Sequence, residues 1–206
     1  MEEKKISETE SLEIISQMIS RTKDRYIGNG NVLLLWGYLT VLVTVVIWAL
    51  LAMTHNEMWN CLWYIIPVVG GIATFVMKRK NQGRKGVKNY SDKISSKIWT
   101  AVEYSCIVSM LFCCGFELIN KDCWDMMFAF ALIIVPFAEV VQGVVVREKS
   151  LTLGGVFGLH VGVFAMCCMI GGIKLDANWF LPLFVLAFIC MMILPGHVLN
   201  LKSKRQ

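Results

Sequence analysis

Charged residues are scarce in this sequence, and long stretches have almost none. The four charged residue types make up 17% of the 206 residues, while 56% are apolar in the broad sense. Soluble domains usually have about 25% charged and 45–50% apolar residues. Crossing a bilayer core takes roughly 20 helical residues, and six stretches are long enough: 32–53, 58–77, 98–119, 124–146, 151–173 and 179–200. The sequence therefore predicts an all-α integral membrane protein with six transmembrane helices in one domain, residues 32–200.

Two further absences narrow the fold. The apolar stretches do not alternate polar and apolar residues, which excludes a transmembrane β-barrel. The first thirty or so residues are too polar for a cleavable signal peptide, so we expect none. With nearly all of the chain in the membrane domain, no room is left for a separate soluble domain.

Patterns that mark catalysis or metal binding are also lacking. None of the eight cysteines forms a CxxC pair, and the chain has no HExxH and no GxSxG. The cysteines lie within or at the edges of the apolar stretches, where Cys packs as a small apolar residue. We therefore predict no catalytic residue, no metal site, no cofactor and no enzymatic activity. One oxidised pair, Cys61 with Cys123, stays open because both lie toward the same face.

Positive charge is distributed very unevenly between the loops. Eighteen Lys and Arg residues lie on one side of the predicted spans and two on the other. The positive-inside rule then puts both termini, including the tail 201–206, on the cytoplasmic side of the membrane. Topology explains the net charge of +5, so the bilayer is an expected partner and nucleic acid is not.

The first 31 residues predict a cytoplasmic amphipathic helix followed by a Gly/Asn joint. Leu12, Ile15 and Ile19 follow helical spacing, so one side of the helix is apolar. This candidate partner face could lie on the inner leaflet, pair with a second copy or bind a cytoplasmic protein. It could equally pack against its own bundle.

Two features inside the spans concern helix packing. Pro67, Pro136 and Pro195 each lie within an even-numbered span, which is compatible with three hairpin repeats. Transporters often have repeats and broken helices, so this pattern is also compatible with transport. Gly154, Gly158 and Gly162 form a ridge on which another helix backbone can approach closely, either from this chain or from a second copy.

Ionisable side chains lie in the inner half of four different spans. A charge is too costly to face lipid, so we expect Glu103 to face the interior of the bundle and Glu139 to face protein or water. The candidate intramembrane polar pocket comprises Glu103, Tyr104, Glu139, Gln142, His160 and His197. An apolar replacement of Glu139 would then leave a histidine without its partner. The group can be structural, its members pairing with one another or with the hydroxyls of Tyr38 and Tyr104. It can instead line a path for protons or small cations, or bind zinc as an enzyme would.

The order "ESLEIISQMI", a Gly/Asn joint and then "LLLWGYL" resembles a family of small uncharacterised bacterial integral membrane proteins. The resemblance covers mainly residues 11–40, and it implies a membrane accessory or regulatory role without assigning any site residue. We therefore expect a non-enzymatic accessory protein with a cytoplasmic contact helix, which binds a cytoplasmic protein or associates with itself. The alternatives are a small transporter or channel that uses the Glu and His residues, and a metal-dependent intramembrane enzyme.

Overall fold

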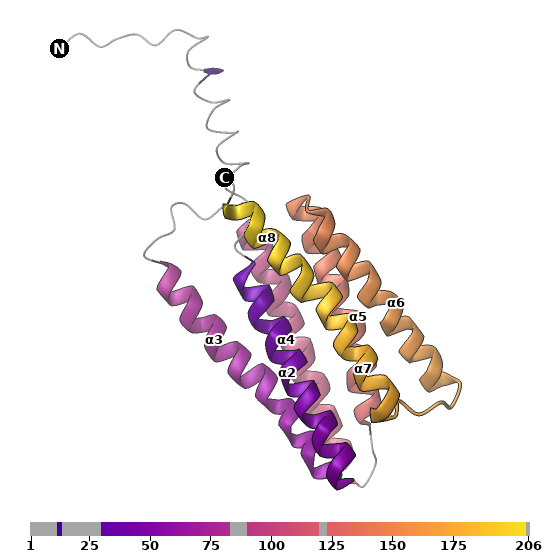
Figure 1. Ribbon diagram of the computed structural model, residues 1–206. Helices are drawn as coiled ribbons and strands as arrows, with labels where there is room; N and C mark the ends of the chain where they lie inside the picture. Colours follow the sequence, from indigo (N-terminus) through magenta and orange to yellow (C-terminus); the bar gives the residue numbers. More distant parts are fainter. Residues whose placement is uncertain (1–11, 14–29, 83–89, 120–122, 205–206) are drawn as a thin grey trace, which may run out of the picture.

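The computed structural model describes residues 12–13, 30–82, 90–119 and 123–204. Within these residues the chain forms helices and no strand: α2 (Asn31–Thr54), the 3-10 helix η1 (Glu57–Tyr64), α3 (Ile65–Gln82), α4 (Tyr90–Glu117), α5 (Trp124–Val146), α6 (Lys149–Ile170), α7 (Ala177–Phe188), the π-helix η2 (Ile189–Ile193) and α8 (Leu194–Lys204). They form one bundle, with α3 at the left edge of Figure 1 and α6 at the right. Six segments of the described residues are long and apolar enough to cross a membrane, which confirms the predicted six-helix membrane fold.

The predicted spans agree with α2, α5 and α6 to within three residues at each end, whereas α4 begins at Tyr90, eight residues before the third predicted span, 98–119. The fourth span, 124–146, coincides with α5 at both ends, and the fifth corresponds to Lys149–Ile170. The second span differs because it begins as the 3-10 helix η1, and the sixth is divided into α7, η2 and α8. Of the predicted N-terminal partner face, Leu12 is exposed, and Ile15 and Ile19 lie outside the described residues.

The π-helical turn in the sixth span has a local cause. Leu194 N–H bonds to the carbonyl of Ile189, five residues back, instead of four as in an α-helix. Pro195 comes next, and in a regular α-helix its ring would clash with the carbonyl four residues earlier. The wider turn removes that clash. It also brings Met191 and Pro195 against α6, where a Cβ on Gly154 would lie 3.0 Å from atoms of both.

Aromatic rings fill the core where η1, α5 and α7 meet. The centroids of Trp63 and Phe128 are 5.0 Å apart, and those of Phe128 and Phe184 are 5.5 Å apart, both edge-on. Phe180 completes the cluster and is fully buried. Edge-to-face contacts between aromatic rings add stabilisation beyond that from the apolar area they bury. This cluster therefore stabilises the packing of η1, α5 and α7.

The spans of α3 and α4 are the least buried of the six. Each is joined to the rest of the bundle by a tryptophan. Trp36 on α2 donates to Thr74 on α3 at 3.0 Å, and Trp99 on α4 donates to Gln142 on α5 at 2.6 Å. Much of the remaining surface of α3 and α4 is exposed and apolar, so these two helices form the most open side of the domain.

Candidate functional site

A stripe of α5 residues faces α6 along the closest helix contact of the bundle. Leu132, Pro136, Glu139 and Gly143 recur at 4-3-4 spacing and are all buried. Glycines of α6 lie directly opposite, so that a Cβ on Gly158 would lie 2.9 Å from Pro136. Since Glu139 lies between Pro136 and Gly143 on this stripe, its side chain enters the helix contact rather than lipid.

Glu139 is completely buried, with 0% of its surface exposed. Neither of its carboxyl oxygens has a hydrogen-bond partner within the described part of the chain. An ionised carboxylate in such a place would cost several kcal/mol, and even a neutral buried polar group without a partner costs about 1–3 kcal/mol. We therefore expect the acid to be uncharged here, and its position reduces the stability of the fold.

The other members of the predicted polar pocket lie elsewhere. Gln142 accepts the Trp99 bond that joins α4 to α5. His160 is exposed, and its Nδ1 lies 2.7 Å from the carbonyl of Val156 on its own helix. The predicted pocket residues are therefore distributed over separate places, and within the described residues no hydrogen bond joins Glu139 to a histidine.

His197 is also exposed and connects two helices. Its Nε2 lies 2.8 Å from the hydroxyl of Tyr38, so the pair joins α8 to α2. Tyr38 is 51% exposed, which puts this polar contact on the outside of the bundle. The sequence named the Tyr38 hydroxyl as one partner for these groups, whereas the expected site shared with Glu139 is absent, since Glu139 has no hydrogen-bond partner among the described residues.

Glu103 and Tyr104 are exposed on α4, contrary to the expectation that Glu103 faces the interior. Tyr104 is 67% exposed. The Glu103 carboxylate lies toward α3, where a Cβ on Gly71 would be 3.5 Å from its Oε1. An acidic and a phenolic side chain are therefore displayed on the open side of the bundle, within a segment apolar enough to span a membrane.

The glycine ridge is occupied by helices of the same chain. A Cβ on Gly154 would lie 2.9 Å from the carbonyl oxygen of Cys190, and one on Gly158 would lie 2.7 Å from the sulfur of Met191. A Cβ on Gly162 would meet the backbone of Leu132 on α5. The sequence left open whether the neighbouring helix belongs to this chain or to a second copy. In the structure, helices of this chain occupy the ridge.

A charged contact that the sequence did not indicate joins α6 to α8. Glu148 caps α6 through Ser150, and Lys202 Nζ lies 2.7 and 2.8 Å from its two carboxyl oxygens. Burial by itself raises the pKa of Glu148, but the bonds from Lys202 and Ser150 outweigh it and hold the pKa below its usual value. A charged residue just before a helix is a recognisable cap, whereas a partner 54 residues away cannot be read from spacing.

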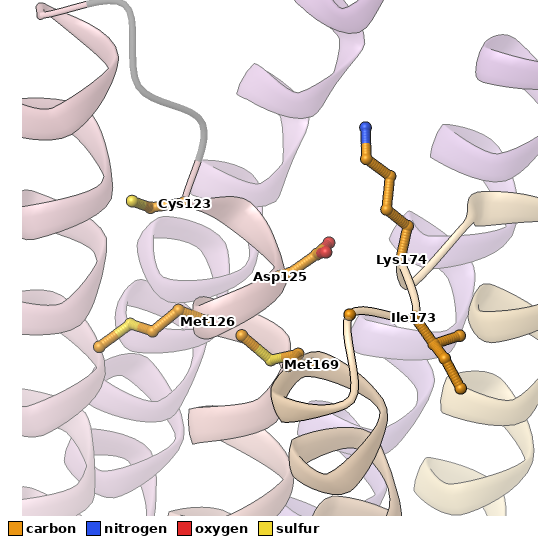
Figure 2. A pocket seen from close by; sticks show the side chains of 7 residues that line it. Cys123, Asp125, Met126, Met169, Ile173 and Lys174 are labelled. Atoms are coloured by element: carbon orange, nitrogen blue, oxygen red, sulfur yellow. The ribbon is translucent and has the colours of Figure 1, made fainter.

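Two cavities lie beside the start of α5. One, of about 310 Å³, is lined by Cys123, Asp125, Met126, Met169, Gly172, Ile173 and Lys174, and Figure 2 shows most of these side chains. The other, of about 240 Å³, is lined by Phe112, Cys113, Phe116, Cys123 and Met126. Cys123 and Met126 line both cavities, so the two are neighbours. Glu139 lines neither.

Comparisons with models of protein families, with curated proteins and with solved structures find no match to this chain. The resemblance noted for residues 11–40 therefore depends on the quoted residues alone.

Proposed function

We propose that this chain is a non-enzymatic accessory or regulatory protein of the bacterial inner membrane that binds a second membrane protein sideways, within the bilayer. The single observation that carries the proposal is the exposure of Glu103 and Tyr104 on α4. Both residues lie in a segment long and apolar enough to span the membrane. Ionisable residues facing lipid are costly and rare, so a surface that displays them fits a role in which another helix covers it.

The surface around these residues is apolar and exposed. Tyr104, Val108 and Leu111 follow 4-3 spacing on α4 and are 67%, 49% and 65% exposed. Glu103 lies beside Tyr104 on the α3 side. We call Glu103, Tyr104, Val108 and Leu111 the α4 lateral face. One carboxylate within an apolar helix surface can accept a hydrogen bond or pair with a cation from a partner helix, which gives the contact its specificity.

Within this proposal both termini lie in the cytoplasm, as the loop charges predict. The N-terminal segment with Leu12, Ile15 and Ile19 then acts as a second contact, on a cytoplasmic part of the same partner. A protein held at two places, one in the membrane and one outside it, gains affinity without either contact being strong.

Purification in a gentle detergent tests the proposal. The wild-type protein should co-purify with a second protein in a fixed ratio, measured by mass spectrometry of the eluate. Glu103→Leu should release that protein, because an apolar side chain removes the acceptor but leaves the surface lipid-compatible. Leu153→Ala, at a position 70% exposed on α6, is the matched control and should retain it. Equal recovery with Glu103→Leu, or no second protein with the wild type, would refute the proposal.

A second candidate function, transport of a proton or small cation, is favoured by Glu139. The Glu139 carboxyl is buried without a partner among the described residues, and it faces α6, which also contacts the π-helical turn η2. Such a group can gain and lose a proton during a transport cycle. Glu139→Gln should then abolish a pH-dependent flux in reconstituted vesicles while the protein stays folded. Since Glu139 lines neither of the two cavities described above, the accessory role has the stronger support.

A further inference from the structure

The smaller cavity has an unusual lining. All five residues that line it are aromatic or contain sulfur: Phe112 and Phe116 with Cys113 on α4, Cys123 at the cap of α5, and Met126 in its first turn. We call this cavity the sulfur pocket. Its volume of about 240 Å³ is ample for a single ion. A buried water needs two to four polar partners, and apart from thiols these side chains offer none.

The two cysteines of the sulfur pocket belong to neighbouring helices that meet here. The thiol of Cys113 donates to the backbone carbonyl of Cys123 at 3.5 Å, so its sulfur lies against the start of α5. Cys113 is 2% exposed. Cys123 and Met126 are three residues apart at the beginning of a helix and therefore project to the same side. Figure 2 shows these two side chains extending in the same direction from α5.

A fourth sulfur side chain approaches from the adjoining cavity. Met169, near the end of α6, lines that cavity together with Cys123 and Met126. Figure 2 shows Met169 reaching toward Met126. Sulfur atoms from α4, α5 and α6 thus gather at one end of the bundle, which the loop charges predict to be the outer end.

This chemistry selects one class of ligand. Thiolates and thioethers prefer soft metal ions such as Cu(I), whereas hard ions need carboxylate and carbonyl oxygens. The described residues contain no group of three His, Cys, Asp or Glu side chains placed to hold a metal ion, so an ion that needs three such ligands does not fit. A monovalent soft ion is satisfied by two thiolates and a weaker thioether.

We propose that the sulfur pocket binds one Cu(I) ion, with Cys113 and Cys123 as thiolate ligands and Met126 as a thioether ligand. Binding forms three sulfur–copper bonds, two to thiolates and one to the thioether, and releases the two thiol protons to solvent, so the site as a whole gains one negative charge. The copper stays monovalent and no electron is transferred. Because protons compete with the metal for the sulfurs, binding becomes weaker as the pH falls.

A Cu(I) titration of the detergent-solubilised, fully reduced chain tests this site. The protein competes without oxygen against a chelator, bicinchoninate, whose Cu(I) complex absorbs visible light, and the loss of absorbance counts the ions bound. The wild type should take one ion more than Cys113→Ser or Cys123→Ser. Cys167→Ser and Cys190→Ser remove cysteines that line neither cavity. Both should keep the wild-type count.

Met126→Leu keeps the proposal testable if a cysteine variant does not fold. Met126 is 42% exposed, so an apolar replacement of similar size should fold normally. Cu(I) should bind it at least about tenfold more weakly, the usual result of losing a supporting ligand group. Equal Cu(I) uptake by the wild type, Met126→Leu and the folded cysteine variants would overturn the proposal. So would a purified wild type whose mass is lower by two hydrogen atoms, with no Cu(I) uptake after reduction, because the pair would then serve as a disulfide.

Discussion

Replacing the buried acid on α5 should stabilise the protein. Glu139 is fully buried and its two carboxyl oxygens have no partner in the described residues. Glu139→Met keeps an unbranched side chain of similar length and removes both oxygens, so the unmet hydrogen bonds disappear. The expected gain in free energy of unfolding is about 1–3 kcal/mol, the usual cost of burying an unsatisfied polar group. Glu139→Gln should stay within about 1 kcal/mol of the wild type, because its amide has no partner either.

Reversible unfolding of the purified protein, followed by helical circular dichroism in mixed micelles with increasing denaturing detergent, measures these differences. Leu132→Ala provides the control for sensitivity. Leu132 lies on the same stripe and is 0% exposed, so its truncation should destabilise by about 2–5 kcal/mol.

A loss of more than about 1 kcal/mol in Glu139→Met would refute the reasoning, since a loss of that size indicates a lost hydrogen bond rather than a removed penalty. The sequence alone gives the opposite expectation for an apolar replacement, because it predicts a histidine beside this acid. The experiment therefore separates the two accounts of Glu139 directly.

Three further predictions concern packing, pH and topology. Gly158→Val should destabilise by more than about 3 kcal/mol, because its side chain would overlap side-chain atoms of Pro136 on α5 and Met191 on η2, whereas Gly115→Ala should not destabilise because nothing lies within 4 Å of its Cβ position; thermal unfolding measures both. Glu148 has a lowered pKa, so near neutral pH the free energy of unfolding of the wild type should exceed that of Glu148→Gln by roughly 1 kcal/mol. This difference should persist above the usual Glu pKa of about 4.3 and vanish as the pH falls through the pKa of Glu148 in the folded state. Equal dependence of the two unfolding free energies on pH would contradict this. Reporter fusions after Asn56 should behave as external and those after Lys149 as internal, and a reversed result would refute the six-span topology.

Hydrophobic length predicts which parts of this chain are helical far better than it predicts which way each helix faces. The span 124–146 coincides with α5 at both ends, because a predominantly apolar stretch of that length can satisfy its backbone hydrogen bonds in a bilayer only as a helix. The same argument does not reveal the π-helical turn before Pro195, which depends on how a proline is accommodated within an otherwise regular helix.

The positions of the polar side chains depend on helix rotation, which the pattern of apolar residues leaves open when all sides are apolar. Glu103 was expected in the interior and is exposed on α4, whereas Glu139 is buried as expected but alone. The glycine ridge, by contrast, could be predicted from the sequence as a site of close helix packing. Gly154, Gly158 and Gly162 can be read from spacing, and Gly155 beside them permits contact with α5, where its Cβ would lie 2.7 Å from the carbonyl of Pro136.

The α4 lateral face is tested most directly by cross-linking within intact membranes. A photo-reactive benzophenone amino acid is placed at Tyr104, which is 67% exposed, and at Leu153 on α6, which is 70% exposed. Illumination should attach a second protein at position 104 and only lipid at position 153, and mass spectrometry of the product identifies what is attached. Lipid alone at both positions, or the same protein captured equally at both, would contradict the account of this chain as a partner-binding membrane protein.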